Sequence, residues 1–366
     1  MLEEIVKPLL SWYRKDHRIL PWRQQKNPYY IWISEIMLQQ TRVEAVKPYF
    51  ERFIQALPTV EEVADCPEEY LLKLWEGLGY YNRVRNIQKA AIVIREKYKG
   101  QLPADYGKLK ELPGIGSYTA GAIASIAYDI PVPAVDGNVL RVYARLMNDE
   151  EDILKQSVKT RVERELGKIM PEESSGDFNQ ALMELGATVC VPNGQPKCDS
   201  CPVKGLCRAY ALGRQMELPV KKKASKRRIE KKTVLVIQDG ERVAVSQRPP
   251  TGLLAGMYEL PNLEGHKSEE EVLKYVSDWG MIPMRIQSVG ESRHIFSHVE
   301  WDMRGFAVKV AALEQSEQKQ MFFVEIKEAE KKYAIPAAFR AYTSYMNMKL
   351  GQEVFSGKNE NSIRKP

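Results

Sequence analysis

Hydrophobic and polar positions follow one pattern before residue 211 and another after residue 232. In the first part, segments such as Val84–Lys97 and Asp152–Ile169 repeat apolar residues at intervals of three and four, which is typical of amphipathic helices. In the second part, Thr233–Gln238 and Arg242–Gln247 alternate between apolar and polar positions, and Asp239-Gly240 lies between them. Asp-Gly between two alternating runs indicates a β-hairpin. The chain is therefore predicted to contain a helical part followed by a separate α+β part.

The second part contains further segments of both kinds. Strands are expected at Gly305–Val310 and Met321–Ile326, and helices at Glu269–Trp279 and Ala337–Met348. A chain of 366 residues is long enough for two or three domains. We predict a multidomain fold with these divisions: an all-α domain at 1–220, a basic linker at 221–232, an α+β domain at 233–350 and a flexible tail at 351–366.

The formal net charge of +6 is concentrated in one segment. Residues 221–232 carry eight basic side chains and one Glu, a charge of +7, so the rest of the chain sums to −1. Such a segment is either a solvated linker or a strip that contacts phosphates, and charge alone does not distinguish the two. DNA binding must therefore be argued from motifs.

Neither a membrane helix nor a targeting signal is expected. No apolar run reaches the roughly 18 residues that a membrane helix needs, and residues 1–20 mix charges with leucines, unlike a secretory signal. The sequence therefore indicates a cytoplasmic protein with reduced thiols, associated with the nucleoid if its source is bacterial.

Four cysteines lie close together in the middle of the chain. Cys190, Cys198, Cys201 and Cys207 have the spacing C-x7-C-x2-C-x5-C, and the only other cysteine is Cys66. Four clustered thiolates can hold a zinc ion or an iron–sulfur cluster. Structural zinc usually takes two closely spaced pairs, and here only the central pair is close, which favours a cluster. A set of disulfides is the other possibility, which an intracellular setting disfavours.

Residues 112–120 (LPGIGSYTA) form a second candidate site. Gly114 and Gly116 follow a proline and predict a tight turn, and a helix begins at once near Ser117. Exposed N–H groups and the helix dipole would then favour an anion such as a DNA phosphate. An ordinary helix–helix turn is the alternative.

Two carboxylates stand out in the helical part. Asp136 comes at a predicted helix start, where N–H groups keep a carboxylate ionised, although simple N-capping would also explain it. Glu35 lies in Tyr29–Thr41, a segment with almost no other charge. Apolar neighbours raise the pKa of a carboxyl group and make it a candidate proton donor. The alternative is a salt bridge between Glu35 and Arg141 or Arg145.

The hairpin, the segment Val135–Arg141 (VDGNVLR) and the cysteine cluster, in this order, resemble the endonuclease III superfamily of DNA glycosylases. Residues 20–23 (LPWR), 34–41 (SEIMLQQT) and 77–83 (GLGYYNR) resemble its MutY branch, and the resemblance extends over about residues 1–348. It implies an all-α helix–hairpin–helix glycosylase domain with one 4Fe-4S cluster held by the four cysteines. It also implies a Nudix-like C-terminal domain, and removal of adenine mispaired with 8-oxoguanine or guanine in double-stranded DNA by a monomer.

The resemblance assigns catalytic roles to four residues. Glu35 would protonate adenine, and Asp136, flanked by Tyr118 and Asn138, would stabilise the sugar cation. Members that also cut the backbone carry a Lys two residues after the second hairpin glycine, and this chain has Tyr118 there. Without that amine no Schiff base forms at this position, which implies a monofunctional enzyme. A lyase and a catalytically silent lesion binder are the alternatives, and the retained Glu35 and Asp136 argue against the latter.

This chain departs from the family pattern in two places, and the resemblance also implies which residues contact DNA. The family usually has six residues between the first two cluster cysteines, and this chain has seven. Residues 268–280 lack the Nudix metal cluster, so pyrophosphatase activity is not expected, and His294 and His298 are read as strand and loop rather than a metal pair. Gln40 and Tyr80 are expected to wedge into the DNA, and Ser297 to inspect 8-oxoguanine. The residues expected to contact DNA or the lesion are Leu38, Gln40, Tyr80, Gly114, Gly116, Ser117, Phe296, Ser297 and His298.

Overall fold

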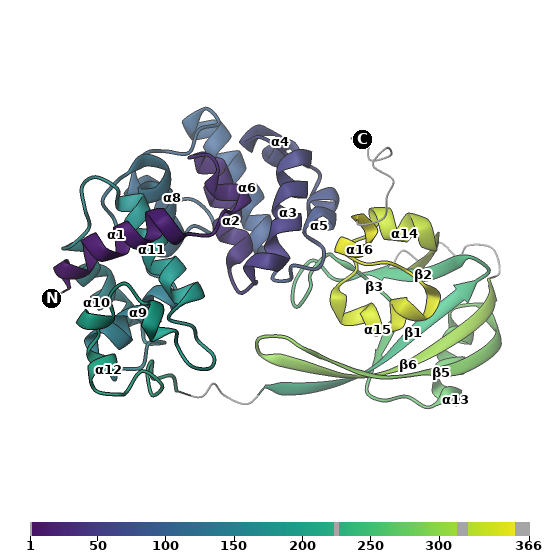
Figure 1. The fold of residues 1–366 in the computed structure, drawn as a ribbon. Coiled ribbons are helices and arrows are strands. Elements are labelled where there is room, and N and C mark those ends of the chain that lie inside the picture. Colours follow the sequence, from purple (N-terminus) through teal and green to yellow (C-terminus); the bar gives the residue numbers. More distant parts are fainter. Residues whose placement is uncertain (1, 223–226, 313–320, 356–366) are drawn as a thin grey trace. The chain divides into compact units, whose positions relative to one another are not determined.

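The computed structural model describes residues 2–222, 227–312 and 321–355. Its internal contacts divide the chain into two compact units, Met1–Asp65 with Arg85–Ala224 and Cys66–Val84 with Ser225–Pro366. The first unit is built of helices, and the second combines a sheet with helices (Figure 1). Residues 66–84 therefore pack with the C-terminal residues, although they lie in the middle of the predicted helical domain.

The first unit consists of helices joined by short connections. The predicted helix at 84–97 is part of α6, whose first turn belongs to the second unit, and the one at 152–169 is shortened to α10. Its helices are α1 (Val6–Asp16), α2 (Pro28–Leu38), α3 (Val43–Ala56), α4 (Val60–Asp65), α6 (Asn82–Tyr98), α7 (Tyr106–Lys110), α8 (Ser117–Tyr128), α9 (Gly137–Met147), α10 (Gln156–Gly167), α11 (Ser175–Thr188) and α12 (Arg208–Ala211).

Helix α2 lies in the interior of this unit because it is apolar on almost all sides. Asn27 caps its first turn by accepting from the N–H of Tyr29 at 2.9 Å, and Pro28 occupies the first helical position. A second core joins α1, α9, α10 and α11 through side chains such as Leu9 and Phe178. These two packed regions fix the helix ends at which the candidate site is built.

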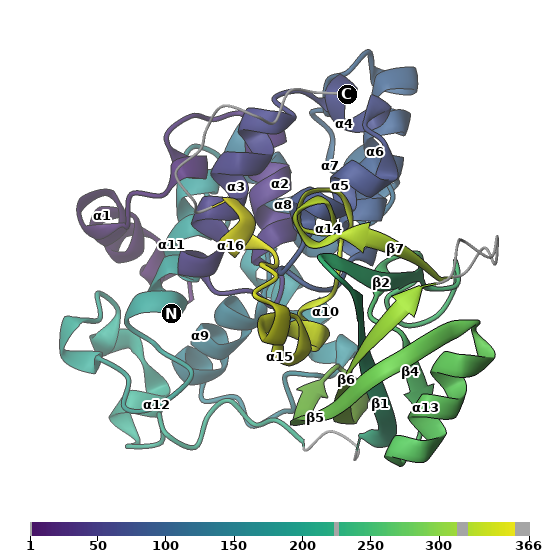
Figure 2. The same cartoon turned by 90° about the vertical axis from the view of Figure 1, so that its right-hand side faces the viewer.

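The second unit is centred on a seven-stranded mixed sheet. The main path is β3-β2-β1-β6-β5, with β4 paired to β1 and β7 paired to β2. Figure 2 shows this sheet with α13 beside it. Strands β1 and β6 are parallel, and the remaining pairs are antiparallel. The strands are β1 (Arg228–Asp239), β2 (Arg242–Gln247), β3 (Tyr258–Glu259), β4 (Asn262–Glu264), β5 (Met281–Ile295), β6 (Val299–Ala312) and β7 (Met321–Glu325).

The alternation of β1 distributes its side chains over two cores. Val234 and Val236 belong to the core on one face, together with Phe339, and Leu235 and Ile237 belong to the core on the other. The first core is covered by residues of the C-terminal helices and the second by α13. The helices of this unit are α5 (Glu68–Trp75), α13 (Glu269–Asp278), α14 (Ile326–Lys332), α15 (Arg340–Thr343) and α16 (Gln352–Phe355).

The structure confirms the predicted hairpin, because Asp239 pairs with Arg242 across the Asp-Gly turn. Three expectations need correction. Residues 228–232 of the predicted linker are strand rather than linker, since they pair with β6. The helix expected at 337–348 ends at Met346, and 3-10 turns at Ala337–Phe339 and Ser344–Met346 directly flank α15. Residues 351–355 of the predicted tail form a turn and α16, whereas 223–226 and 356–366 lie outside the described residues.

Within the described ranges, the model contains no helix of the length and apolarity that crossing a bilayer requires.

Candidate active site

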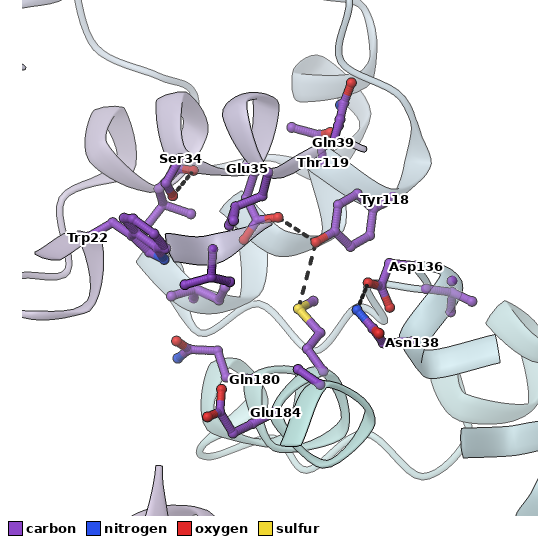
Figure 3. A pocket seen from close by; sticks show the side chains of 18 of the residues that line it. Trp22, Ser34, Glu35, Gln39, Tyr118, Thr119, Asp136, Asn138, Gln180 and Glu184 are labelled. Atoms are coloured by element: carbon purple, nitrogen blue, oxygen red, sulfur yellow. Dashed lines mark hydrogen bonds between the residues drawn. The ribbon is translucent and has the colours of Figure 1, made fainter. Parts of the chain in front are cut away.

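A cavity of about 590 Å³ opens in the first unit, where the end of α2 meets the starts of α8 and α9 and one face of α11 (Figure 3). Its volume lies within the ~300–1,000 Å³ that is typical of small-molecule sites. The helix ends bring residues that are more than 100 positions apart in the sequence to one cavity. The predicted site residues in its lining are Glu35, Leu38, Gln40, Gly116, Ser117, Tyr118, Asp136 and Asn138.

Glu35 is the buried acid of this cavity. Glu35 is only 6 % exposed, and the hydroxyl of Tyr118 donates a hydrogen bond to its carboxylate. Burial raises the pKa of Glu35 from 4.5 to about 7, with the hydrogen bond from Tyr118 lowering it and the negative charge of Asp136 raising it. A carboxyl group with this pKa holds a proton at neutral pH and can donate it to a substrate.

The alternative, that Glu35 forms a salt bridge with Arg141 or Arg145, does not describe the structure. The guanidinium of Arg141 donates to the carbonyl oxygens of Cys190 at 2.8 Å and Gly186 at 2.7 Å. The guanidinium of Arg145 donates to backbone carbonyl oxygens and to the sulfur of Cys190. Both arginines are engaged by the backbone around the cysteine loop, which leaves Glu35 with Tyr118.

Asp136 is the second carboxylate and caps the N-terminus of α9. It accepts hydrogen bonds from the N–H of Val139 at 2.8 Å and from the side-chain amide of Asn138 at 2.7 Å. Burial raises the pKa of Asp136, and these donors oppose the rise. These N–H donors favour the ionised form of Asp136. The capping alternative is therefore true, and the same hydrogen bonds favour a carboxylate in the cavity.

A chain of hydrogen bonds links Asp136 to the cysteine loop. Asn138 donates to Asp136, and the carbonyl oxygen of its side chain accepts from Arg141 at 2.9 Å. Arg141 in turn donates to the backbone oxygen of Cys190. The guanidinium therefore fixes which end of the Asn138 amide faces Asp136.

Polar residues that the sequence analysis did not single out form another wall of the cavity. Glu184 on α11 accepts from Arg18 at 2.6 Å and lies 2.9 Å from the guanidinium of Arg23. Burial alone would raise the pKa of Glu184, but the hydrogen bonds and positive charges of the two arginines outweigh it and lower the pKa. Gln180, one turn earlier, and Trp22 lie beside them in the lining. This wall offers donors, acceptors and an aromatic face to a planar ligand.

Part of this wall could have been found from sequence. Trp22 and Arg23 belong to the LPWR motif, and Gln180 and Glu184 are polar residues four positions apart on the predominantly buried helix α11. Two polar residues on one buried helical face indicate a polar cavity. Arg18, the partner of Glu184, is 166 positions away from it in the sequence, and no local pattern indicates that contact.

The predicted hairpin lies directly before α8. Gly114 has φ +76°, and a Cβ on it would come within 2.6 Å of Asn86, so the turn requires glycine. Gly116 is the N-cap of α8 and has no side chain to close the first turn. The Ser117 hydroxyl donates to Glu163 at 2.8 Å. The exposed turn and uncapped helix start retain the features that were predicted to favour an anion.

The two predicted wedge residues share an unusual backbone conformation. Gln40 follows α2 with φ +59°, and Tyr80 in the second unit has φ +49°. Leu38 is the last residue of α2 and lines the cavity next to Gln40. Tyr80 is 47 % exposed, and the Ser297 hydroxyl lies 3.2 Å from its hydroxyl oxygen. The second unit therefore joins Tyr80 and Ser297, which are 217 positions apart.

Residues 296–298 form the turn between β5 and β6. The ring of Phe296 packs against Trp301 at 4.9 Å and against His294 at 4.7 Å, whereas Ser297 and His298 are exposed. His294 is in a strand and His298 is in the turn, as predicted, so the helical spacing of a metal pair does not apply. The turn presents its two polar side chains outward from a fixed aromatic base.

The four cysteines surround a small cavity of about 30 Å³ between α9, α12 and the connecting loop. No three histidine, cysteine or acidic side chains in the described ranges are arranged to hold a single metal ion. Four cysteine thiolates are the usual donor set of a 4Fe-4S cluster. The guanidinium of Arg145 donates to the sulfur of Cys190 at 3.2 Å. The donor set therefore fits a cluster.

Two family models match the chain. Residues 33–171 match the HhH-GPD superfamily base excision DNA repair protein, and residues 233–345 match the NUDIX domain. The first match contains both carboxylates and the hairpin, and the second contains most of the sheet. The predicted combination of a helix–hairpin–helix glycosylase domain and a Nudix-like domain is confirmed.

Known proteins of similar sequence or structure agree with these matches. An adenine DNA glycosylase of Mus musculus is 37 % identical over 80 % of this chain and 68 % of its own length. That of Buchnera aphidicola subsp. Baizongia pistaciae is 34 % identical over 80 % of this chain and 82 % of its own length. A non-covalent endonuclease III–DNA complex superposes with a TM-score of 0.50 at 28 % identity, over 59 % of this chain and 99 % of that protein.

Proposed function

Because the chain belongs to the adenine DNA glycosylase family of base excision repair enzymes, we propose that its substrate is adenine paired with 8-oxoguanine or guanine in double-stranded DNA. We further propose that it acts as a monomer and hydrolyses the glycosidic bond without cutting the backbone. The observation that carries this proposal is the pairing of two carboxylates in one cavity, a buried Glu35 with a pKa of about 7 and an Asp136 held by N–H donors.

The target base must leave the helical stack before it can reach these groups. Enzymes that act on a base in DNA rotate the nucleotide into a pocket, and the energy required is a few kcal/mol. In this chain the pocket is the cavity between α2 and α11, and Gln40 at its rim would fill the space left in the duplex. The polar wall of Arg18, Gln180 and Glu184 is suited to hydrogen bonds with the edge of a purine.

Bond cleavage then proceeds through opposite roles of the two acids. Glu35 donates its proton to adenine, at N7 by resemblance to the family, and the electron pair of the glycosidic bond leaves with the base. The sugar becomes an oxocarbenium ion, which the Asp136 carboxylate stabilises or traps transiently. Water adds to the sugar carbon, and its proton returns to Glu35. One neutral acid and one carboxylate is the division that this chemistry needs.

Tyr118 supports the assignment to hydrolysis. Its hydroxyl donates to Glu35 and cannot form a Schiff base, whereas a lyase would carry an amine at this position. Its burial keeps the phenol neutral by raising its pKa. We infer that Tyr118 orients Glu35, and that the reaction product is an abasic site in an uncut strand.

The cysteines Cys190, Cys198, Cys201 and Cys207 would hold a 4Fe-4S cluster, which supplies a rigid centre for the loop when it is bound. The loop carries Lys197 and Lys204 within residues 190–207, and these lysines are suited to phosphate contacts. Arg141 connects the same loop to the Asn138 amide beside Asp136.

Reading of the opposite base is proposed for the second unit. Ser297 is exposed at the tip of the β5–β6 turn next to Tyr80, and Phe296 anchors the turn by packing against Trp301. The serine hydroxyl can donate to or accept from the edge of an oxidised guanine. His298 lies beside it in the same exposed turn.

A single-turnover assay tests this function. The protein is mixed with duplex DNA that contains adenine opposite 8-oxoguanine, and samples are divided into those with and without hot alkali. Strand breaks only after alkali are expected, because base removal leaves an alkali-labile abasic site. Glu35→Gln should bind the same duplex but remove no base, with Glu51→Gln, an exposed residue on α3, as the matched control. Breaks without alkali, or normal cleavage by Glu35→Gln, would overturn the proposal.

A further inference from the structure

A buried ion pair lies at the end of α5 in the second unit. The Nζ of Lys73 donates to the carboxylate of Glu76 at 2.7 Å, and the two side chains are only 3 % and 1 % exposed. Buried ion pairs contribute little net stability, because removing both charges from water offsets their attraction. Where such a pair occurs, its best-attested use is to specify one arrangement of the chain. The position of this pair therefore requires an explanation beyond stability.

The pair joins α5 to distant backbone segments near the C-terminus. Glu76 accepts from the N–H of Ile335 at 2.7 Å and from the N–H of Gly351 at 2.8 Å. Lys73 also donates to the carbonyl oxygen of Tyr333 at 3.1 Å. Burial raises the pKa of Glu76, and Lys73 and the two N–H groups oppose the rise. One carboxylate thus joins the end of α5 to two backbone segments that lie more than 250 positions later in the sequence.

The chain leads directly from this pair to Tyr80. Gly77 and Gly79 have φ +101° and +70°, so the connection is a tight turn with a defined path. Trp75 donates from its indole N–H to the oxygen of Gly79 at 3.1 Å. Arg83 donates to the same oxygen at 3.1 Å, and its guanidinium carbon lies 5.6 Å from the centre of the Tyr80 ring. The turn is therefore rigid between Glu76 and the tyrosine.

We propose that Lys73 and Glu76 are positioning residues for recognition of the opposite base, because they lock the Tyr80 turn onto the domain that carries Ser297. The inference rests on the proposed role of Tyr80 and Ser297 in reading 8-oxoguanine. The 3.2 Å distance between the two hydroxyl groups depends on the relative position of two chain segments. The buried pair and its backbone partners determine that position.

The consequence is a specific kinetic defect when the pair is broken. In Glu76→Gln, the amide keeps the shape of the side chain, but its oxygen replaces only one of the two carboxylate oxygens that accept from Ile335 and Gly351. In Lys73→Met, the carboxylate keeps its N–H donors and loses the cation. Both variants leave Glu35, Asp136 and Tyr118 in the other unit unchanged. Base removal opposite guanine should therefore be nearly normal.

The experiment compares single-turnover rate constants for adenine opposite 8-oxoguanine and adenine opposite guanine. Glu76→Gln and Lys73→Met should lower the ratio of the two constants by about tenfold, which corresponds to about 1.4 kcal/mol of transition-state discrimination. Single-turnover constants do not depend on the active fraction, so a loss of folded protein alone leaves the ratio unchanged. Lys73→Arg keeps the cation and should restore most of the ratio.

The exposed pair Lys332–Glu328 on α14 is the matched control, because it has the same 2.7 Å distance but lies at the surface. Lys332→Met should leave the ratio unchanged. If Glu76→Gln does not fold, the double variant Lys73→Met/Glu76→Met, which buries no charge, takes its place and should show the same lowered ratio.

Ser297→Ala distinguishes a failure of the positioning role of Lys73 and Glu76 from a failure of the proposed 8-oxoguanine recognition. If Ser297→Ala lowers the ratio while both pair variants retain it, the positioning inference is wrong and the proposed function stands. If neither the wild-type protein nor Ser297→Ala distinguishes the two substrates, the proposed recognition of 8-oxoguanine is wrong, and the inference falls with it. A parallel loss for both substrates would assign Lys73 and Glu76 a purely structural role.

Discussion

Replacing Glu35, the proposed catalytic acid, should make the protein more stable. Glu35 is buried among apolar side chains of α2, and its ionised form is poorly solvated there. Glu35→Gln retains the size of the side chain and an oxygen that can accept from the Tyr118 hydroxyl. The substitution therefore removes the ionisable proton and little else.

The size of the expected gain in unfolding free energy follows from the raised pKa of Glu35. Moving the pKa of a carboxyl group from 4.5 to about 7 makes its ionisation in the folded protein less favourable by about 3 kcal/mol, at about 1.4 kcal/mol per pH unit. Between these two values the folded protein binds more protons at Glu35 than the unfolded chain does. Stability is therefore lost as pH rises through about 7. The glutamine variant lacks this loss.

The assay is denaturant unfolding followed by tryptophan fluorescence, for wild type and variant at pH 5.5 and pH 8. The gain in unfolding free energy from Glu35→Gln should be about 2 kcal/mol larger at pH 8 than at pH 5.5. The control Glu51→Gln, on the exposed side of α3, should change stability by less than about 0.5 kcal/mol at either pH. An equal effect of Glu35→Gln at both pH values would refute the account of Glu35 as an acid with a raised pKa.

Three further predictions concern the cavity and its rim. With protonated Glu35 as the proposed active form, the single-turnover rate should fall about tenfold per pH unit above a pKa of about 7. Tyr118→Phe should move this fall to higher pH, because it removes a hydrogen bond that lowers the pKa of Glu35. Arg141→Met should reduce the rate by about 10- to 100-fold by freeing the Asn138 amide; an unchanged rate would exclude this orienting role. Gln40→Gly should increase unfolding free energy by about 1 kcal/mol while slowing base removal, since φ +59° suits glycine; unaltered base removal would remove Gln40 from the wedge role.

Local chemistry made part of the site predictable. Glu35 was identified because a carboxylate in an apolar helix is rare, and Asp136 because its position at a helix start has a known electrostatic consequence. The Asp239-Gly240 hairpin followed from its turn residues. In each case the cause of the structure lies within about ten residues of the feature.

The remaining features depend on contacts between distant segments. The strand at 228–232 carries the charges of the basic segment, and only its parallel pairing with β6, about 70 positions away, reveals it as a strand. The pairing of Arg18 with Glu184 and of Glu76 with Gly351 is likewise a consequence of the fold. The helical periodicity of residues 337–348 correctly indicates a helical segment, which buries Phe339 and Tyr342 against the sheet, but it does not reveal that 3-10 turns flank α15 on both sides.

Gln40 in the first unit and Tyr80 in the second share a strained backbone conformation. Both adopt left-handed backbone conformations, with φ +59° and +49°, although such positions favour glycine. Holding a long side chain there costs on the order of 1 kcal/mol or more at each residue. The long side chain of Gln40 is exposed beside the cavity. Its strain is consistent with a side chain whose compensating contacts form with DNA. Tyr80 carries the same strain, and its contacts with Arg83 and Ser297 hold its side chain at the turn that is proposed to read the opposite base.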